Sequence, residues 1–349
     1  METVVECKNG APVLAHVRKD EHGHFVEHDL HAHLLGVAKI ASEYASFFGS
    51  SDWAYLAGLW HDLGKYSKEF QRRIKLLSGY DPEAHLEGKP GRVDHSTAGA
   101  LHAIAQIGMP GRILAYLIAG HHAGLPDWHT GETGGAALKA RLDDKSHLDR
   151  ALSQDIPQTI LVQPKPTSPL LGKSDGFALW VRMLFSCLVD ADFLDTEAFM
   201  DADKGMQRVS TTTIQELLQR FNAYMNENFA EVTPTSVNRI RAEVLRQCRE
   251  KANGPSGIFS MTVPTGGGKT LSSLAFALQH AAKHDKRRVI YVIPYTSIIE
   301  QTANIFRGIF PDAVVEHHSN LDPDKETTVK NRLAAENWDA PRLPEPNKD

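Results

Sequence analysis

The sequence predicts a mainly α-helical protein, in which a helical first domain is followed by part of an α/β lobe. Apolar residues recur at helical spacing through most of the first 230 residues, which is the pattern of amphipathic helices. After Gly257, two short apolar runs, IFSMTVP and RRVIYVIP, are each followed by a helical segment. This alternation of strand and helix is typical of a parallel sheet.

The helical pattern can be divided into separate elements along the chain. The segment 125–175 is rich in proline and glycine and predicts mostly loop. The EVTPTS segment interrupts the helical pattern, so we expect a domain boundary there, with domains at 1–230 and 231–349. The charged, proline-rich segment 336–349 predicts disorder. Helices are expected at 33–48, 52–63, 95–107, 111–122, 176–194, 212–230 and 236–252.

Composition excludes several classes of protein. The three cysteines lie far apart and predict neither a disulfide framework nor a thiolate zinc site. No long apolar run or secretory signal is present, so we expect a cytoplasmic protein without a membrane partner. The net charge of −5 means that any nucleic-acid binding must rest on a local basic track or on bound metal. Of the 18 histidines, 14 lie between His16 and His147, which directs attention to the first domain.

The strongest candidate site is the pair His61 and Asp62, at the end of an apolar helix, with Lys65 three residues beyond. Adjacent helical residues project about 100° apart, so an aspartate here can bridge two cations. We therefore assign catalytic roles to Asp62, as the bridging ligand, and to Lys65, which can stabilise charge on a phosphate oxygen. The full set of predicted metal ligands is His33, His61, Asp62, His95, His121, His122 and Asp192.

This donor set indicates both a kind of metal and a kind of reaction. Many imidazoles with two carboxylates suit manganese, iron, cobalt or nickel better than magnesium, which prefers oxygen ligands. Two such cations about 4 Å apart support hydrolysis of a phosphodiester. Single histidines more often satisfy a buried hydrogen bond than bind metal, and the spacing assigns nothing more to His28, His31, His102 and His129.

A second candidate site is the glycine-rich run VPTGGGKT at 263–270, placed between a predicted strand and an apolar helix. In such a loop the backbone amides bind phosphates, the lysine reaches the terminal phosphates and the threonine holds magnesium. The predicted nucleotide-binding residues are Thr265, Gly266, Gly267, Gly268, Lys269 and Thr270.

These motifs together resemble one family, the CRISPR-associated helicase-nucleases of type I systems, and within it the type I-C branch. The resemblance runs from His28 to Asn320 and rests on ordered blocks that include HLLGVA, LWHDLGK, DHSTAGA, IAGHHAGLPD, LVDADFLDTE, VPTGGGKT, VIPYTSIIEQT and EHHSN. It implies an all-helical HD-type nuclease domain that cuts single-stranded DNA, followed by a RecA-like superfamily 2 motor driven by ATP and magnesium. It also implies a partner, the surveillance complex bound to target DNA.

The resemblance implies a division of the ligands as well. One metal would be held by His33, His61, Asp62 and Asp192, and the other by Asp62, His95, His121 and His122. The chain departs from the family after EHHSN, because no acidic DE-type box follows Thr270. We therefore expect a chain truncated within the first motor lobe, with weak or absent ATP binding and no ATPase or helicase activity.

Two other functions remain open at this stage. The same helical scaffold and ligands suit an HD-type nucleotide phosphohydrolase, although the phosphate-binding loop argues against that assignment. A truncated product that only binds a partner is the third possibility. Retention of every proposed ligand favours chemistry but does not exclude such binding.

Overall fold

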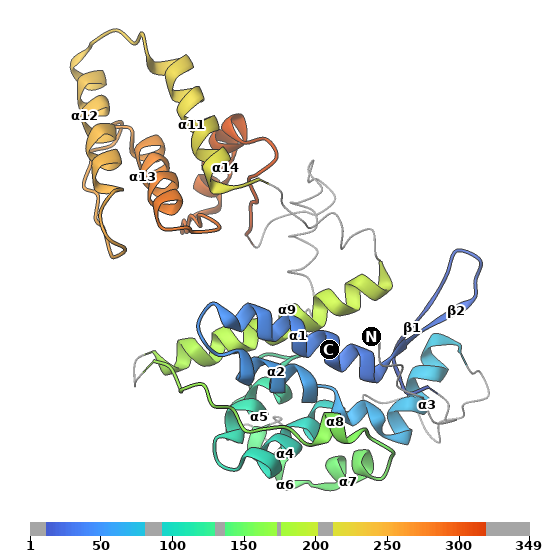
Figure 1. Cartoon of the computed structure of the whole chain (residues 1–349). Helices are drawn as coiled ribbons and strands as arrows, with labels where there is room; N and C mark the ends of the chain where they lie inside the picture. The colour runs from blue at the N-terminus through green and yellow to red at the C-terminus, as the bar shows by residue number, and fades with distance from the viewer. Residues whose placement is uncertain (1–11, 81–92, 130–136, 173–175, 202–211, 319–349) are drawn as a thin grey trace, which may run out of the picture. The chain divides into compact units, whose positions relative to one another are not determined.

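The computed structural model describes residues 12–80, 93–129, 137–172, 176–201 and 212–318, drawn as coloured ribbon in Figure 1. The described residues fall into two compact units, one ending at Asp201 and the other beginning at Thr212. The sequence placed the boundary later, after Ala230. Helix α11 belongs instead to the second unit, because its Phe221 is buried against Leu274 and Leu278 there. The prediction of a mainly helical fold is confirmed.

The first unit begins with an antiparallel hairpin, β1 (Leu14–Lys19) and β2 (Phe25–Asp29). Its turn is closed by the Asp20 carboxylate, which accepts from the backbone N–H groups of His22 and His24. The hairpin was not predicted, since we took the whole domain to be helical. Its pairing register sets His16 opposite His28, next to the start of the first helix.

Five helices supply the core of the first unit. Glycines allow the backbones of neighbouring helices to pack closely. At Gly99, for example, an added Cβ would lie 1.8 Å from the carbonyl oxygen of Trp60. Trp60, the largest fully buried side chain, donates its indole N–H to the carbonyl of Ile160 at 2.8 Å. The five helices are α1 (Leu30–Ser46), α2 (Ser51–Trp60), α4 (Ser96–Ile107), α5 (Gly111–Gly120) and α9 (Phe177–Met200).

Further helical elements complete the described part of the first unit. The expectation that 125–175 is mostly loop was partly wrong, because apolar residues such as Leu138, Ala151 and Ile160 anchor three short helices against the core. Pro157 directly precedes α8, whereas α6 and α7 have neither proline nor glycine at their caps. The elements are η1 (Leu63–Tyr66), α3 (Lys68–Ser78), α6 (Leu138–Asp143), α7 (Ser146–Leu152) and α8 (Gln158–Leu161).

The second unit has its own apolar core, centred on Phe221 of α11 and on Leu274 and Leu278 of α13. Its helices are α11 (Ile214–Phe229), α12 (Ser236–Lys251), α13 (Lys269–Lys283) and α14 (Thr296–Ile309). Helix α11 starts with a capping box, in which the Thr213 hydroxyl and the Glu216 carboxylate each accept from the other's backbone N–H. Among the described residues of both units, no helix is long and apolar enough to span a membrane.

The two strands predicted after Gly257 are not formed in the described part of the second unit. The runs 258–264 and 287–294 lie outside any helix or strand. A parallel strand needs hydrogen-bonding neighbours for its backbone, and no described segment pairs with these runs. Several of their apolar side chains are open to solvent, with Ile258 and Val292 103% and 90% exposed, whereas Val289 and Tyr291 pack against the core of the unit. The predicted disorder of 336–349 lies outside the described residues.

Candidate metal centre

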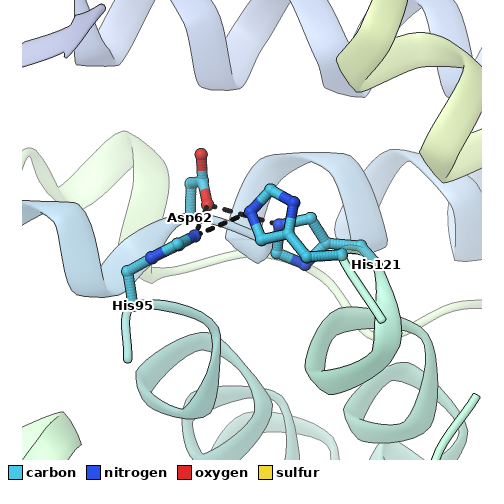
Figure 2. Close-up of side chains that lie close together, drawn as sticks. Asp62, His95 and His121 are labelled. Carbon is cyan, nitrogen blue, oxygen red and sulfur yellow. Dashed lines mark hydrogen bonds and ion pairs between the residues drawn. The ribbon is translucent and has the colours of Figure 1, made fainter. Parts of the chain in front are cut away.

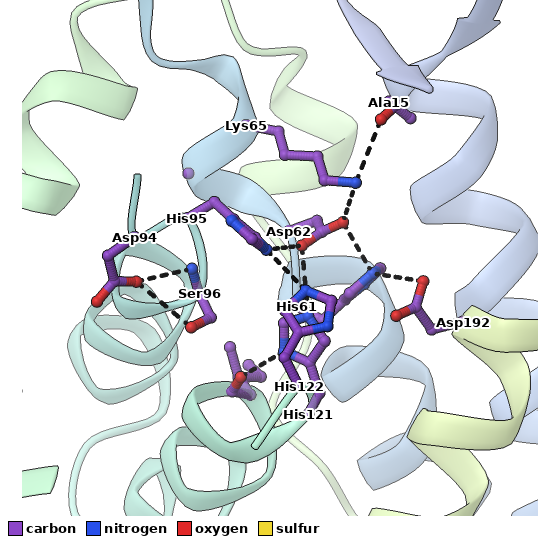
Figure 3. A network of polar contacts seen from close by, with 12 residues as sticks. Ala15, His61, Asp62, Lys65, Asp94, His95, Ser96, His121, His122 and Asp192 are labelled. Atoms are coloured by element: carbon purple, nitrogen blue, oxygen red, sulfur yellow. Dashed lines mark hydrogen bonds and ion pairs between the residues drawn. The ribbon is translucent and has the colours of Figure 1, made fainter. Parts of the chain in front are cut away.

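The predicted ligands come from five separate segments of the first unit and lie close together around Asp62. Figure 3 shows six of them, with His33 not labelled there. His33 lies within α1, and Asp192 lies within α9. The others follow or precede helices: His61 and Asp62 follow α2, His95 precedes α4, and His121 and His122 follow α5. The structure therefore brings together all seven residues that the sequence singled out as ligands.

Asp62 stands at the centre of this group, and its two oxygens face different histidines. Oδ1 lies 3.3 Å from Nε2 of His95 and 3.5 Å from Nε2 of His121 (Figure 2). Oδ2 lies 3.2 Å from Nε2 of His61 and 3.6 Å from Nε2 of His33. Asp192 joins the group of His33 and His61, because its Oδ1 lies 3.5 Å from Nε2 of each of these histidines.

The backbone orients two of these imidazoles. Nδ1–H of His61 donates to the carbonyl of Gly58, and Nδ1–H of His121 donates to the carbonyl of Ile118, both at 2.7 Å. Each acceptor lies three residues back in the last turn of a helix, where carbonyls lack partners within the helix. Burial opposes protonation of His61, but the carboxylates of Asp62 and Asp192 raise its pKa to about 10, so without metal its Nε2 also carries a proton, which a metal would displace. With only Nδ1 protonated, the lone pair of Nε2 points into the centre, which is the tautomer that a metal ligand needs.

The side chains present fit divalent metal ions. Nε2 of His33, of His61 and of His121 are all buried without a hydrogen-bond partner. Buried polar atoms are normally satisfied, so such a group of orphaned acceptors marks a place for a cation. The ligand atoms of two sets each lie within 4.8 Å of one another, and the sets share Asp62; they are His33, His61, Asp62 and Asp192, and Asp62, His95, His121 and His122.

Charge and burial oppose each other at this centre. Burial favours a raised pKa for Asp62, but the neighbouring His61 and Lys65 hold that pKa well below its usual range. Burial lowers the pKa of His95 to about 4 and the pKa of His122 to about 3. These histidines are therefore neutral near pH 7 and the aspartate is ionised, which are the forms that coordinate metal.

Lys65 belongs to the same centre. Its ammonium lies 2.7 Å from Oδ2 of Asp62 and 3.3 Å from the carbonyl oxygen of Ala15. The 3₁₀ helix η1 turns the chain so that this side chain returns towards the aspartate. The lysine therefore places a positive charge beside the carboxylate at the centre.

Gly64 has a role that the sequence did not reveal. Its N–H donates to the carbonyl of His95 at 3.0 Å, and an added Cβ would lie 2.2 Å from that oxygen. Only glycine allows this approach, which holds the segment of Asp62 against the start of α4. Asp94 anchors the same start, because its carboxylate accepts from the N–H and hydroxyl of Thr97 and pairs with Arg141.

The four histidines to which the sequence assigned no role differ in where they lie relative to the centre. His102 satisfies a hydrogen bond with the carbonyl of Leu161 at 2.9 Å, and His129 is exposed beside Trp128, so both remain outside the centre. His31 has a buried Nε2 without a partner. His28 lies beside the centre instead, with its ring 5.2 Å from that of His33. The sequence analysis also missed His16, the partner of His28 across the hairpin. Alternating residues on both sides of the DEHG turn could have predicted this hairpin.

The phosphate-binding candidate lies in the second unit. Gly266 and Gly268 both have φ of +82°, a conformation that favours glycine. Gly268 caps α13, so Lys269 and Thr270 occupy the first turn of that helix, as predicted. The guanidinium of Arg241 donates to the carbonyl of Gly266 at 2.8 Å and holds the loop. The remaining loop residues, Thr265 and Gly267, complete an open run of backbone amides ahead of a helix.

Comparison with known proteins identifies both parts. The HD domain family matches residues 30–151, and the type III restriction enzyme, res subunit, family matches residues 232–339. The CRISPR-associated nuclease/helicase Cas3 of Haloferax volcanii is 26% identical over 307 residues, which cover 70% of this chain and 31% of that protein. The chain thus carries an HD domain followed by a helicase-type domain, and it is similar to a Cas3 nuclease/helicase over both.

Solved Cas3 structures resemble the chain as well. Crystal structures of T. fusca Cas3 with AMPPNP and with ATP match with a TM-score of 0.49, at 16% and 17% identity. Each match covers 88% of this chain. It covers 40% of the Cas3 chain in the AMPPNP structure and 39% of that in the ATP structure. The chain thus spans about a third of the curated Cas3 and two fifths of the solved one. The HD match contains six of the seven candidate ligands, and Asp192 lies beyond it.

Proposed function

We propose that the first unit is a two-metal nuclease that hydrolyses phosphodiester bonds of single-stranded DNA. The observation that carries the proposal is the placement of Asp62, whose two oxygens face separate groups of imidazoles with orphaned Nε2 atoms. Divalent metals bound there would activate a water and stabilise the attacking and leaving oxygens of the displacement. The first metal is assigned to His33, His61, Asp62 and Asp192, and the second to Asp62, His95, His121 and His122.

The ligand chemistry favours particular metals. Each set combines imidazole nitrogens with carboxylate oxygens, a mixture that suits manganese, iron, nickel or cobalt. Magnesium is disfavoured because it prefers oxygen ligands and keeps its waters. Asp62 bridges the sets, so its ionised form is needed by both, and the low pKa of its carboxyl provides that form near neutral pH.

The edge of the centre open to a substrate is defined by burial. The side chains of His95 and Asp192 are 14% and 17% exposed, whereas that of His61 is fully buried. His122 is also open to solvent, so we infer that a scissile phosphate approaches along the edge formed by His95, His122 and Asp192. Lys65, already beside Asp62, supplies positive charge for the non-bridging phosphate oxygens as charge builds on them. A single strand can bend into this edge, whereas pairing and stacking stiffen a duplex.

The biological setting is proposed from the relatives. The Haloferax protein is named a CRISPR-associated nuclease/helicase, and we assign this chain to CRISPR interference, with a type I surveillance complex on target DNA as its partner. In the second unit, the loop at 265–270 is proposed to contact the phosphates of ATP with magnesium, and this binding is expected to be weak or absent in the present chain.

A substrate panel tests the proposal. The purified chain is analysed for metal content and then assayed on single-stranded DNA, duplex DNA and deoxynucleotides with manganese, nickel, cobalt or magnesium. We expect transition-metal-dependent cleavage of single strands without ATP, slower cleavage of duplex, and loss of activity with a chelator. Hydrolysis of deoxynucleotides with single strands left intact would replace the nuclease by a nucleotide phosphohydrolase. Metal-loaded protein that hydrolyses neither would leave only partner binding.

A further inference from the structure

A third group of histidines, His16, His28 and His33, adjoins the metal centre from the hairpin side. Nδ1 of His16 lies 3.2 Å from Nδ1 of His28, and Nε2 of His16 lies 3.4 Å from the ammonium of Lys65. Nε2 of His28 lies 3.6 Å from Oδ2 of Asp195, and that oxygen is also 2.7 Å from Nδ1 of His33. The contacts thus run from Lys65 to His33 through two histidines and one aspartate.

Only one assignment of ring protons makes every contact in this series a donor facing an acceptor. Lys65 can only donate, so Nε2 of His16 accepts and its Nδ1 carries the proton. Nδ1 of His28 then accepts, and its Nε2–H points towards Asp195. Asp195 also accepts from Nδ1–H of His33, which leaves Nε2 of His33 as the free lone pair facing Asp62. Burial lowers the pKa of His16 to about 2, so its ring is neutral as this assignment requires.

The group is a poor match for a third metal. Nδ1 of His33 is engaged by a carboxylate at 2.7 Å, and its Nε2 belongs to the centre around Asp62. The facing Nδ1 atoms of His16 and His28 satisfy each other. None of these three rings therefore has a lone pair to spare for a further cation, whereas the ligands of the main centre have orphaned Nε2 atoms.

The fold makes specific room for Asp195. This residue lies three positions after Asp192 on α9, so both carboxylates project from one side of that helix. Opposite it on α1 stands Gly36, where an added Cβ would meet Oδ1 of Asp195 at 2.1 Å. His28, in turn, is held by a stacked contact with Phe199, at 4.4 Å between ring centroids.

We propose that Asp195 is a positioning residue for the metal centre, which fixes the ring of His33 with Nε2 directed at the metal, and that His28 and His16 extend this support to Lys65. The inference rests on the proposed metal-dependent function. Carboxylate partners of ligating histidines commonly contribute a factor of about 10–100 to metal affinity. Asp195 contacts neither substrate nor metal, so its effect is expected on metal binding first.

The test measures metal affinity, by calorimetric titration of the metal-free chain with manganese. We expect Asp195→Ala to weaken binding at one of two sites by about 10–100-fold, with Asp195→Asn retaining part of the affinity because its amide oxygen still accepts from His33. Gly36→Ala displaces the same carboxylate without altering any ligand and should weaken the same site. Cleavage of single-stranded DNA by these variants should recover at saturating manganese.

Two matched controls accompany these variants. Asp190→Asn changes an exposed carboxylate on the same helix, and Gly308→Ala changes a helical glycine whose added Cβ meets nothing within 4 Å. Both should bind manganese as the wild type does. Side-chain nitrogen NMR of the metal-free chain should show a protonated Nδ1 for His16 and a protonated Nε2 for His28.

The outcomes separate the inference from the function on which it rests. Wild-type manganese affinity in both Asp195→Ala and Gly36→Ala overturns the positioning role, whatever their thermal stability. Three bound metals per chain, falling to two in His28→Gln, would instead make the third group a metal site. A wild-type chain that binds two metals and leaves single-stranded DNA intact contradicts the nuclease proposal alone, since the affinity comparison still stands.

Discussion

The two candidate sites of this chain differ in how they are built. The metal centre consists of side chains from five segments, buried in the core of the first unit and dependent on contacts such as that of Gly64 with His95. The phosphate loop of the second unit is a contiguous run of residues that offers backbone amides to solvent at the start of α13. Packing therefore controls the first site, whereas local backbone conformation controls the second.

The largest effect is expected at the shared ligand of the buried site. Asp62→Ala removes the carboxylate that faces both groups of imidazoles, so single-stranded DNA cleavage should fall by about 10³-fold or more. Metal content, measured by elemental analysis, should fall with it. Asp127→Ala, an exposed aspartate of the same unit, is the control and should retain both. Full cleavage with stoichiometric metal in Asp62→Ala would remove the centre from the proposed mechanism.

A substitution at Lys65 distinguishes the stabilisation of charge in the transition state from metal binding at the buried site. Lys65→Ala should lower the cleavage rate by about 100-fold, a loss typical of removing one group that stabilises transition-state charge. Bound metal should remain near the wild-type amount, because the predicted ligands are unchanged. Single-turnover kinetics at saturating metal measure this loss. An unchanged rate would mean that the ammonium serves only to balance the charge of Asp62.

A pair of glycine substitutions sharpens the contrast in packing. Gly64→Ala forces a Cβ against the carbonyl of His95, and we expect a loss of about 3 kcal/mol in the free energy of unfolding of the first unit. Gly308→Ala meets open space on α14 and should leave the second unit unchanged or stabilise it by up to about 1 kcal/mol. Urea denaturation measures both. Equal effects from the two substitutions would contradict the difference in packing.

The smallest effect is expected when the exposed site is altered. Lys269→Ala changes a residue of the phosphate loop in the second unit and should leave ATP-independent cleavage of single-stranded DNA within about twofold of wild type, since every predicted metal ligand lies in the first unit. Binding of ATP, followed by fluorescence titration, is the property that this substitution should weaken. A large loss of cleavage without ATP would show that the two sites are coupled.

Local sequence patterns were sufficient to predict those elements whose conformation depends on residues close together in the chain. The main helices follow from apolar spacing, and the phosphate loop follows from glycines directly ahead of a helix. The seven candidate ligands were also chosen from the sequence, from histidines and aspartates within or beside apolar helices, and the structure brings their side chains together. Asp192 was selected from the acidic run VDADFLD, and it is the aspartate of that run whose carboxylate reaches His33 and His61.

Only the tertiary structure decided how these residues work together. The acceptor that Asp195 offers to His33 and the close approach that requires Gly64 join segments far apart in the chain, and the pairing of the hairpin strands sets His16 against His28. The runs after Gly257 show the same limit, since their strand-like composition did not provide partners for their backbones. Residue spacing records which groups a helix presents, but donors, acceptors and close contacts between distant segments exist only once those segments pack.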